Sequence, residues 1–318
     1  LCTRLLKGWS DLQAQDMQVS RISGGISNLL VKVEPPPPLQ PVAVKVRVFG
    51  DKTELLIDRE AEKHLLLRLN QAGFGALVVG LFGNGRIEQF LTAKTLTPEE
   101  MSDPRFIPHI ARRLRAFHDL KMDAEAAATA AAAAASAPNP TGWDSMFCWL
   151  AMAEGLSFAH DPAKQAVYDK VDFRAMRTEL TALREMCERV GSTRVLCHND
   201  LLAGNILLQF IDFEYSCRGP RGFDWGNHFN EYAGFDCVYD RFPSPEQQKV
   251  FFRHYLSPRD GNSNQGQGEA VLDCLVAEAC VFALASHAYW GVWSFIQARY
   301  SPIDFDYLDY SRMRWAEY

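Results

Sequence analysis

Hydrophobic and polar positions alternate along the first part of the chain with the two-residue period of β-strands. Alternation on both sides of SGGIS, at 23–27, predicts two strands joined by a tight glycine loop. The Gly-Asn-Gly sequence at 83–85 predicts a turn between two further strands. Together these patterns predict strands at residues 17–22, 28–33, 42–49, 76–82 and 86–91.

The hydrophobic spacing becomes helical at 53–70 and again beyond about residue 97. Thr53 is the candidate N-cap of the first of these helices, with a glutamate close behind it. The later pattern predicts an amphipathic helix at 106–120, and mostly helical structure at 142–190 and from 243 to the end. We therefore predict an α+β protein with a sheet lobe at 1–95 and a helical lobe at 96–318.

Two segments depart from this pattern. The alanine run within 124–140 has high helix propensity but no apolar stripe to bury, which predicts a frayed insertion in a loop. At 206–211 one apolar run continues directly into the next, without the turn residues that a hairpin needs. Either this segment is built unusually or residues are missing from the printed chain, and the second explanation is favoured.

Composition narrows the classes of partner. The 318-residue chain has a net charge of −6 and no basic block, which argues against nucleic-acid binding. No run of about 18 uncharged apolar residues stands out, so no membrane span is expected. The eight cysteines form no C-x-x-C pair. Their scatter is typical of reduced thiols in a cytoplasmic protein, not of a disulfide framework or a zinc site.

The first two candidate elements of a phosphate-binding site lie in the sheet lobe. In ISGGISN, at 22–28, glycines allow backbone N–H groups to approach phosphate oxygens, and Ser23 and Ser27 add hydroxyl donors. A plain hairpin turn would explain the same loop. In VAVKVRV, Lys45 and Arg47 project from one face of their strand and could hold phosphates.

A helix carboxylate could hold this strand cation in place, and Glu62 or Glu60 is the candidate. A solvated strand face would explain the two cations equally well.

The third and fourth elements lie in the helical lobe. Asp200 and Asn205 form D-x-x-x-x-N, the spacing of the protein-kinase catalytic loop. Asp200 would accept the proton of the substrate hydroxyl, and Asn205 offers an amide oxygen to Mg²⁺. Asp212, in FIDFEY, follows a predicted buried strand and would be the second magnesium ligand. His198 is expected to support the loop through hydrogen bonds.

These motifs resemble the choline/ethanolamine kinase family over nearly the whole chain. The resemblance is carried by ISGGISN, VRVFG, DRE, GRIEQFL, HNDLLAGN, IDFEYS, RGFDWGNHFNEYAG and ASHAYWGVWSFIQA. It implies the two-lobed, protein-kinase-like fold of the aminoglycoside phosphotransferases, with ATP and Mg²⁺ as cofactors. It also implies a small-molecule amino alcohol as substrate, a place at the first step of the CDP-alcohol route to phospholipids, and a homodimer.

The resemblance assigns roles to individual residues. Arg47 resembles the ATP-phosphate contact, with Lys45 as its rival, and the backbone of Gln89 and Leu91 resembles the hinge that meets adenine. Asp200 resembles the catalytic base, and Asn205 and Asp212 resemble the metal ligands. The amino-alcohol pocket is expected to form from Tyr215, Glu231, Trp290, Trp293 and Tyr310. Aromatic faces and a carboxylate suit a choline or ethanolamine head group, although aromatic residues at helical spacing commonly form core.

Several readings stay open at this point. GDKTELLIDRE looks like ethanolamine kinases, whereas GRIEQFLTAKTL and WGVWS look more like choline kinases. The alternatives are a kinase of another small hydroxylated substrate, such as an aminoglycoside, and a pseudokinase that only binds nucleotide. The intact Asp200, Asn205 and Asp212 argue against a pseudokinase, and the lack of an A-P-E sequence argues against a protein kinase.

Overall fold

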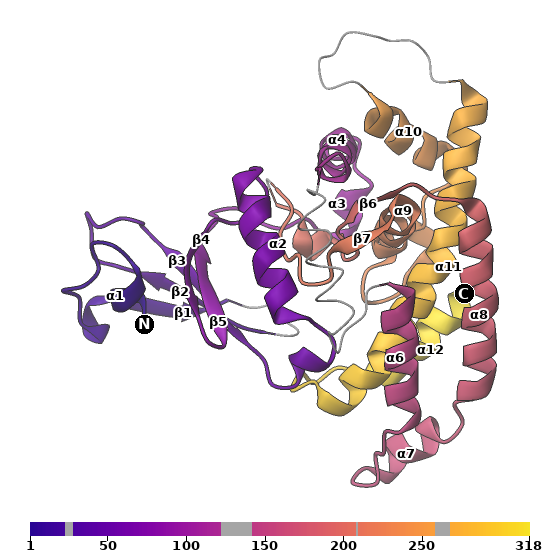
Figure 1. Ribbon diagram of the computed structural model, residues 1–318, viewed down its shortest axis with the longest axis horizontal. Coiled ribbons are helices and arrows are strands. Elements are labelled where there is room, and N and C mark those ends of the chain that lie inside the picture. Colours follow the sequence, from indigo (N-terminus) through magenta and orange to yellow (C-terminus); the bar gives the residue numbers. More distant parts are fainter. Residues whose placement is uncertain (23–27, 122–141, 208, 258–267) are drawn as a thin grey trace. The chain divides into compact units, whose positions relative to one another are not determined.

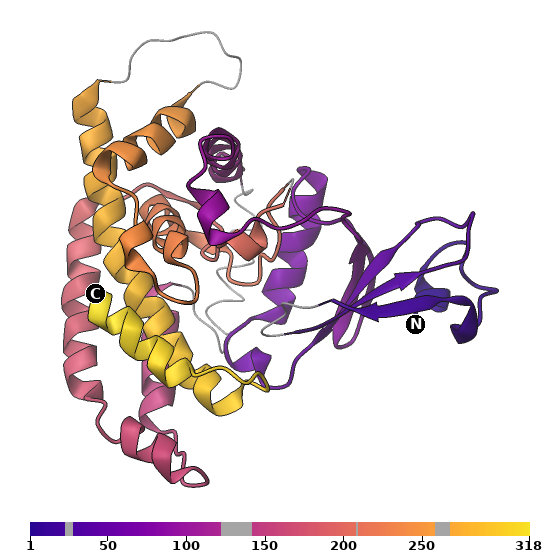
Figure 2. The same cartoon turned by 180° about the vertical axis from the view of Figure 1, so that it is seen from behind.

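The computed structural model describes residues 1–22, 28–121, 142–207, 209–257 and 268–318 (Figures 1 and 2). The chain divides into two compact units, each described here by itself. The first unit is Leu1–Lys94 with Leu207–Ile211, and the second is Thr95–Ile206 with Asp212–Tyr318. The division of labour predicted for 1–95 and 96–318, ATP binding in one and the amino-alcohol pocket in the other, stays a prediction.

The first unit is built on a five-stranded antiparallel sheet in the order β1-β2-β3-β5-β4. Alternation along β3 places Val44 and Val46 in a core with Ile87 and Trp9, and sends Lys45 to the opposite face. The strands are β1 (Gln18–Arg21), β2 (Asn28–Glu34), β3 (Val44–Phe49), β4 (Val78–Phe82) and β5 (Gly85–Gln89).

The main helix of this unit, α2 (Arg59–Gln71), begins later than the sequence suggested. Thr53 does not cap it, because Thr53–Leu55 is a separate 3₁₀ turn, η2. The N-cap is Asp58, whose side chain accepts hydrogen bonds from the backbone N–H groups of Glu60 and Ala61. A short helix, α1 (Cys2–Leu5), and a 3₁₀ turn, η1 (Ala14–Asp16), precede the sheet.

The second unit is mostly helical. Its helices are α3 (Pro98–Met101), α4 (Ile107–His118), α6 (Trp143–Glu154), α7 (Pro162–Tyr168), α8 (Phe173–Val190), α9 (Arg221–Asn230), α10 (Pro245–Leu256), α11 (Glu269–Tyr300) and α12 (Tyr307–Glu317). A two-stranded ribbon of β6 (Arg194–Cys197) and β7 (Cys217–Pro220) carries the segment with the candidate catalytic residues. The described residues of this unit also form the 3₁₀ turns η3 (Ala203–Asn205), η4 (Glu231–Ala233) and η5 (Tyr239–Arg241).

The long helix α11 packs against α9, α12, α6, α10 and α8 in this unit (Figure 1). Its length and apolar composition would suffice to cross a membrane, which is weak evidence because core helices share these properties. A continuous stretch from Ala285 to Gln297 is buried inside the unit. The structure therefore gives α11 the packing of a core helix.

The strand expected just before Asp212 is not formed. Ile206 and Phe210 are isolated bridge residues, and the backbone N–H of Leu207 donates to the carbonyl of Gln209. Residue 208 lies outside the described residues, as do the alanine run within 124–140 and Ser23 and Ser27.

Candidate active site

The loop after β6 holds the candidate base and one candidate metal ligand together. The side-chain amide of Asn205 donates to the carbonyl oxygen of Asp200 at 2.8 Å and to its carboxylate at 2.9 Å. Asn205 is buried and ends the 3₁₀ turn η3, so the five-residue spacing seen in the sequence becomes a direct contact. The bond uses the amide nitrogen of Asn205 and leaves its oxygen to serve as a metal ligand.

The loop is anchored by Asp224, a fully buried residue on α9 that the sequence analysis left without a role. Its carboxylate accepts the backbone N–H of His198 at 2.7 Å and that of Asn199 at 2.6 Å. It also contacts the ring of His118 at 2.9 Å. Burial would raise the pKa of Asp224, but the hydrogen bond and charge of His118, the charge of His198 and the backbone N–H of Asn199 lower it. Asp224 lies in the quoted motif RGFDWGNHFNEYAG, which is the signal that could have pointed to it.

The same region brings three ligand types close together. His118, Cys197 and Asp224 place one ligand atom each within 4.8 Å of one another. The two ring nitrogens of His118 already contact Tyr255 and Asp224, and the thiol of Cys197 lies 3.4 Å from the carbonyl of Pro220. These contacts indicate a structural anchor and no metal centre.

Asp200 lies among other carboxylates. Burial, followed by the charges of Asp212, Glu231 and Glu214, raises its pKa well above the usual value. A bound cation would be attracted by these like charges. The donor set of Asn205 and Asp212 therefore fits Mg²⁺, which prefers hard oxygen ligands. Asp212 also has φ of 65°, a backbone conformation uncommon outside glycine and frequent at functional sites.

The aromatic residues predicted for the amino-alcohol pocket come together in the second unit. The indole N–H of Trp293 donates to the hydroxyl of Tyr215 at 2.8 Å. The ring of Trp290 lies 5.3 Å from that of Tyr215 and 5.3 Å from that of Trp293, both edge-to-face. This arrangement has the edge-to-face geometry of a packed aromatic cluster, and its ring faces can attract a cation.

Glu231 and Tyr310 share one partner that the sequence analysis did not identify. Arg314, on α12, donates to the carboxylate of Glu231 at 3.0 Å and to the hydroxyl of Tyr310 at 3.2 Å. Burial would lower the pKa of Arg314, but Tyr310 and Glu231 raise it above its usual value. The carboxylate expected to meet a substrate ammonium is thus already paired with a buried guanidinium.

In the first unit, the predicted partner of Lys45 is wrong. Its ammonium pairs with Glu88 on the neighbouring strand β5 at 2.6 Å, because the two residues are directly opposite in register. Glu62 instead binds Arg86 at 2.6 Å and Arg59 at 2.8 Å. Glu60, the other candidate, pairs with Lys63 on the surface of α2.

Glu88 joins these pairs into one buried ionic cluster. It binds Arg86 at 2.6 Å as well as Lys45. Burial would raise the pKa of Glu88, but Lys45, Arg86 and Arg47 together hold it far below the usual value. Arg47, whose side chain is buried, lies on the same face of the sheet and opposite Arg86 in register. Arg47, which was predicted to contact ATP phosphates, is therefore a buried member of this ionic cluster.

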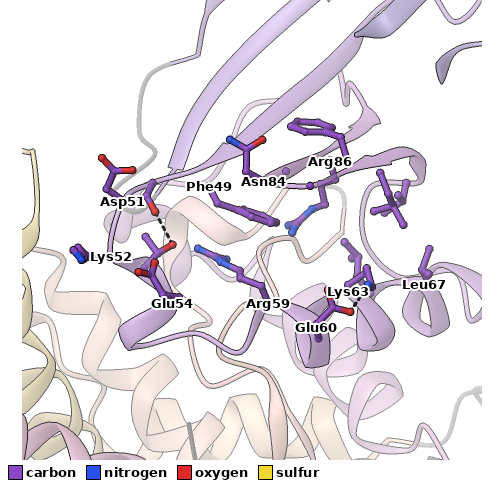
Figure 3. Close-up of a pocket in the computed structure, with 18 residues that line it drawn as sticks. Phe49, Asp51, Lys52, Glu54, Arg59, Glu60, Lys63, Leu67, Asn84 and Arg86 are labelled. Atoms are coloured by element: carbon purple, nitrogen blue, oxygen red, sulfur yellow. Dashed lines mark hydrogen bonds and ion pairs between the residues drawn. The ribbon is translucent and has the colours of Figure 1, made fainter. Parts of the chain in front are cut away.

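A cavity of about 780 Å³ opens beside this cluster, between α2 and the strands β3, β4 and β5 (Figure 3). The side chains of Phe49, Arg59 and Arg86 face one another along it, and the guanidinium of Arg59 lies 4.3 Å from the centre of the Phe49 ring. Lys45 and Arg47 are not among its lining residues. Gln89, one hinge candidate, is the last residue of β5, and its backbone N–H donates to the carbonyl of Leu77 at 2.7 Å, which leaves its carbonyl to meet adenine. Leu91, the other hinge candidate, follows the strand.

Comparison with known proteins identifies the family and the fold of the chain. The sequence model of the choline/ethanolamine kinase family matches residues 19–318. A probable ethanolamine kinase of Arabidopsis thaliana is 40% identical over 326 residues, covering 100% of this chain and 83% of the relative. An ethanolamine kinase of Plasmodium vivax has a similar structure, with a TM-score of 0.86, 31% identity and coverage of 99% of this chain and 86% of that one.

An aminoglycoside 2′-phosphotransferase-IIIa shares the fold at 15% identity, with a TM-score of 0.59 and coverage of 97% of this chain and 94% of that one. At this level of identity the likeness concerns the fold alone. The predicted α+β, kinase-like fold and the predicted resemblance are thereby confirmed.

Proposed function

Because the chain belongs to the choline/ethanolamine kinase family, we propose that it transfers the γ-phosphoryl group of ATP to ethanolamine, with choline as a second substrate. The observation that carries the proposal is the contact between Asp200 and Asn205, in the same unit as the aromatic cluster of Tyr215, Trp290 and Trp293. The ethanolamine kinases among the relatives support the order of the two substrates.

In the proposed mechanism, the carboxylate of Asp200 accepts the proton of the substrate hydroxyl as the oxygen attacks the γ-phosphorus. The bond to Asn205 holds the carboxylate in place, and Asp224 fixes the loop that carries both residues. Asn205 and Asp212 would hold Mg²⁺, which neutralises charge on the phosphates when bound. The aromatic cluster and Glu231 would hold the ammonium end of the substrate.

The cations of the first unit, Arg47 and Lys45, would contact the ATP phosphates. The buried pair with Glu88 keeps the ammonium of Lys45 on the cationic face of the sheet. The product, phosphoethanolamine, would enter the CDP-alcohol route to phospholipids.

The test is turnover of ethanolamine and choline by the purified protein with ATP and Mg²⁺. We expect phosphorylation of ethanolamine, and we expect Asp200→Ala to lower kcat by about 10²- to 10⁴-fold, since that is the usual contribution of a general base. Asp240→Ala, at an exposed position, is the matched control and should leave kcat unchanged. A folded wild-type protein that phosphorylates neither alcohol would refute the function, and an active Asp200→Ala would refute the assignment of the base.

A further inference from the structure

Arg314 lies at the centre of a hydrogen-bond network in the second unit. Its side chain is 1 % exposed, yet its guanidinium meets three acceptors on three elements. One terminal nitrogen, Nη1, donates to Glu231 at 3.0 Å and to Tyr310 at 3.2 Å. The other, Nη2, donates to the hydroxyl of Ser286 on α11 at 2.9 Å. A planar guanidinium is suited to such a fork, because its donors have fixed directions.

The network continues from Ser286 to the aromatic cluster. The hydroxyl of Ser286 donates to the side-chain oxygen of Asn227 on α9 at 2.8 Å. The indole N–H of Trp290 donates to the same oxygen at 2.7 Å. A chain of hydrogen bonds from Arg314 thus reaches Glu231 and Tyr310 directly and Trp290 through two intermediates, all of them buried.

We propose that Arg314 is a positioning residue that holds the carboxylate and the aromatic walls of the amino-alcohol pocket in their binding arrangement. The inference rests on the proposed function, because it concerns the pocket assigned there. Arg314 acts through Glu231, Tyr310 and Trp290, and it need not touch the substrate.

The chemistry of Glu231 gives the direction of the expected effect. Arg314 is the partner of the Glu231 carboxylate in the described part of the chain. Without Arg314 the Glu231 carboxylate loses the guanidinium that fixes its direction in the pocket, and a buried unpaired carboxylate is costly. Removing Arg314 should therefore weaken binding of a cationic amino alcohol and leave ATP binding unchanged.

The experiment compares Arg314→Met with Arg312→Met. Arg312 lies on the same helix, is 68 % exposed and pairs with Asp309, so it is a matched control for loss of a positive charge from α12. We expect Arg314→Met to raise KM for ethanolamine about 30-fold or more, because truncating one partner of a buried charged pair is costly. KM for ATP should stay within about twofold, and Arg312→Met should match the wild type.

A double-mutant cycle with Glu231→Gln separates positioning from a general loss of stability. If Arg314 acts through Glu231, Arg314→Met should add little to the increase in KM that Glu231→Gln already causes. Independent, additive effects of the two substitutions would overturn the proposal. If Arg314→Met does not fold, Arg314→Lys takes its place, since an ammonium keeps the charge but cannot reproduce the planar fork, and a raised KM for ethanolamine is again expected.

Calorimetric binding of ethanolamine keeps this test independent of turnover. A wild-type protein that binds ethanolamine without phosphorylating it would refute the proposed function, while the Arg314 variants could still be compared by affinity. Folded Arg314 variants that bind ethanolamine as the wild type does would overturn the positioning role and leave the proposed function standing.

Discussion

At the scale of single residues, buried polar side chains fix the loop of the candidate base Asp200 from several sides. Asp224 binds the N–H groups of His198 and Asn199, immediately before Asp200. His228, also on α9, contacts the carbonyl of Leu201, immediately after it, at 3.1 Å. As a neutral ring, His228 donates its Nδ1–H to that carbonyl. The geometry around Asp200 therefore depends on residues that need not contact a substrate.

The buried ring of His228 predicts a loss of stability in mild acid. Burial lowers its pKa from 6.5 to about 4, with the Leu201 carbonyl and Asp224 opposing and His198 reinforcing the shift. Well above pH 6.5 the ring is neutral whether the chain is folded or unfolded. Between pH 6.5 and 4 the unfolded chain binds the proton more tightly, so the free energy of unfolding should fall by about 3 kcal/mol in total.

Denaturant unfolding measured from pH 7.5 to pH 4 tests this prediction. His228→Gln should flatten the pH dependence by this amount, whereas His64→Gln, at an exposed position on α2, should leave it unchanged. An unaltered slope in a folded His228→Gln protein would show that other groups cause the loss of stability in acid. Burial also lowers the pKa of His287, to about 2, so this residue decreases stability in acid equally in the wild type and in both variants.

Contacts within one loop were easier to predict from the sequence than contacts between distant segments. Asp200 and Asn205 were recognisable because a fixed spacing along one loop becomes one contact. The partner of Lys45 depends instead on strand register, which places Glu88 directly opposite it. Glu62 on helix α2 pairs with Arg86 and Arg59. Arg314 lies far along the chain from Glu231 and Ser286, so no local pattern could connect them.

At the scale of elements, most helices and strands followed from hydrophobic period, and the errors have local causes. The helix expected at 53–70 begins at Arg59, because Asp58 is a better N-cap than Thr53 and a 3₁₀ turn occupies 53–55. The strand expected before Asp212 fails because that segment bends after Ile206 and reaches Asp212 with φ of 65°. The spacing of hydrophobic residues alone does not reveal that a segment leaves the extended conformation.

The close packing of α9 on α11 makes Gly226 a position where even one methyl group should be harmful. A Cβ atom there would lie 2.4 Å from the backbone nitrogen of Ala283 and 2.8 Å from the carbonyl oxygen of Ala279. Backbone atoms of a buried helix cannot move aside as a side chain can. Gly226→Ala should therefore lower the free energy of unfolding by about 3 kcal/mol or more.

Thermal or denaturant unfolding measures this effect, with Gly155→Ala as the control. Gly155 follows α6 with φ of −90°, and a Cβ atom there would meet only the Met152 carbonyl, at 3.6 Å. Its substitution should change stability by less than about 1 kcal/mol. Equal effects of the two alanine variants would mean that the helix contact at Gly226 yields more readily than its geometry indicates.

At the scale of the whole molecule, the two units have different proposed functions: the first binds the ATP phosphates, and the second binds the amino alcohol and carries the base. The cationic face with Lys45 and Arg47 belongs to the first unit, and Asp200 and the aromatic cluster belong to the second. The sequence indicated this order of motifs along the chain, because each unit is nearly continuous in sequence. Whether each unit binds its own substrate, ATP or ethanolamine, is measured by steady-state kinetics.

Paired variants from the two units test this split through their Michaelis constants. Arg47→Met should raise KM for ATP about 10- to 100-fold, as expected for loss of a charge-assisted contact, and leave KM for ethanolamine nearly unchanged. Trp293→Leu removes an aromatic face and the bond to Tyr215, and should raise KM for ethanolamine about 5- to 30-fold while KM for ATP stays the same.

A third variant, Lys45→Met, decides which of the two rival cations, Lys45 or Arg47, binds the ATP phosphates. Because Lys45 already neutralises Glu88, we expect its loss to affect stability more than KM for ATP. A larger rise in KM for ATP in Lys45→Met than in Arg47→Met would transfer the phosphate-binding role to Lys45. If either Arg47→Met or Trp293→Leu changed both constants equally, the two units would not divide the substrates in this way.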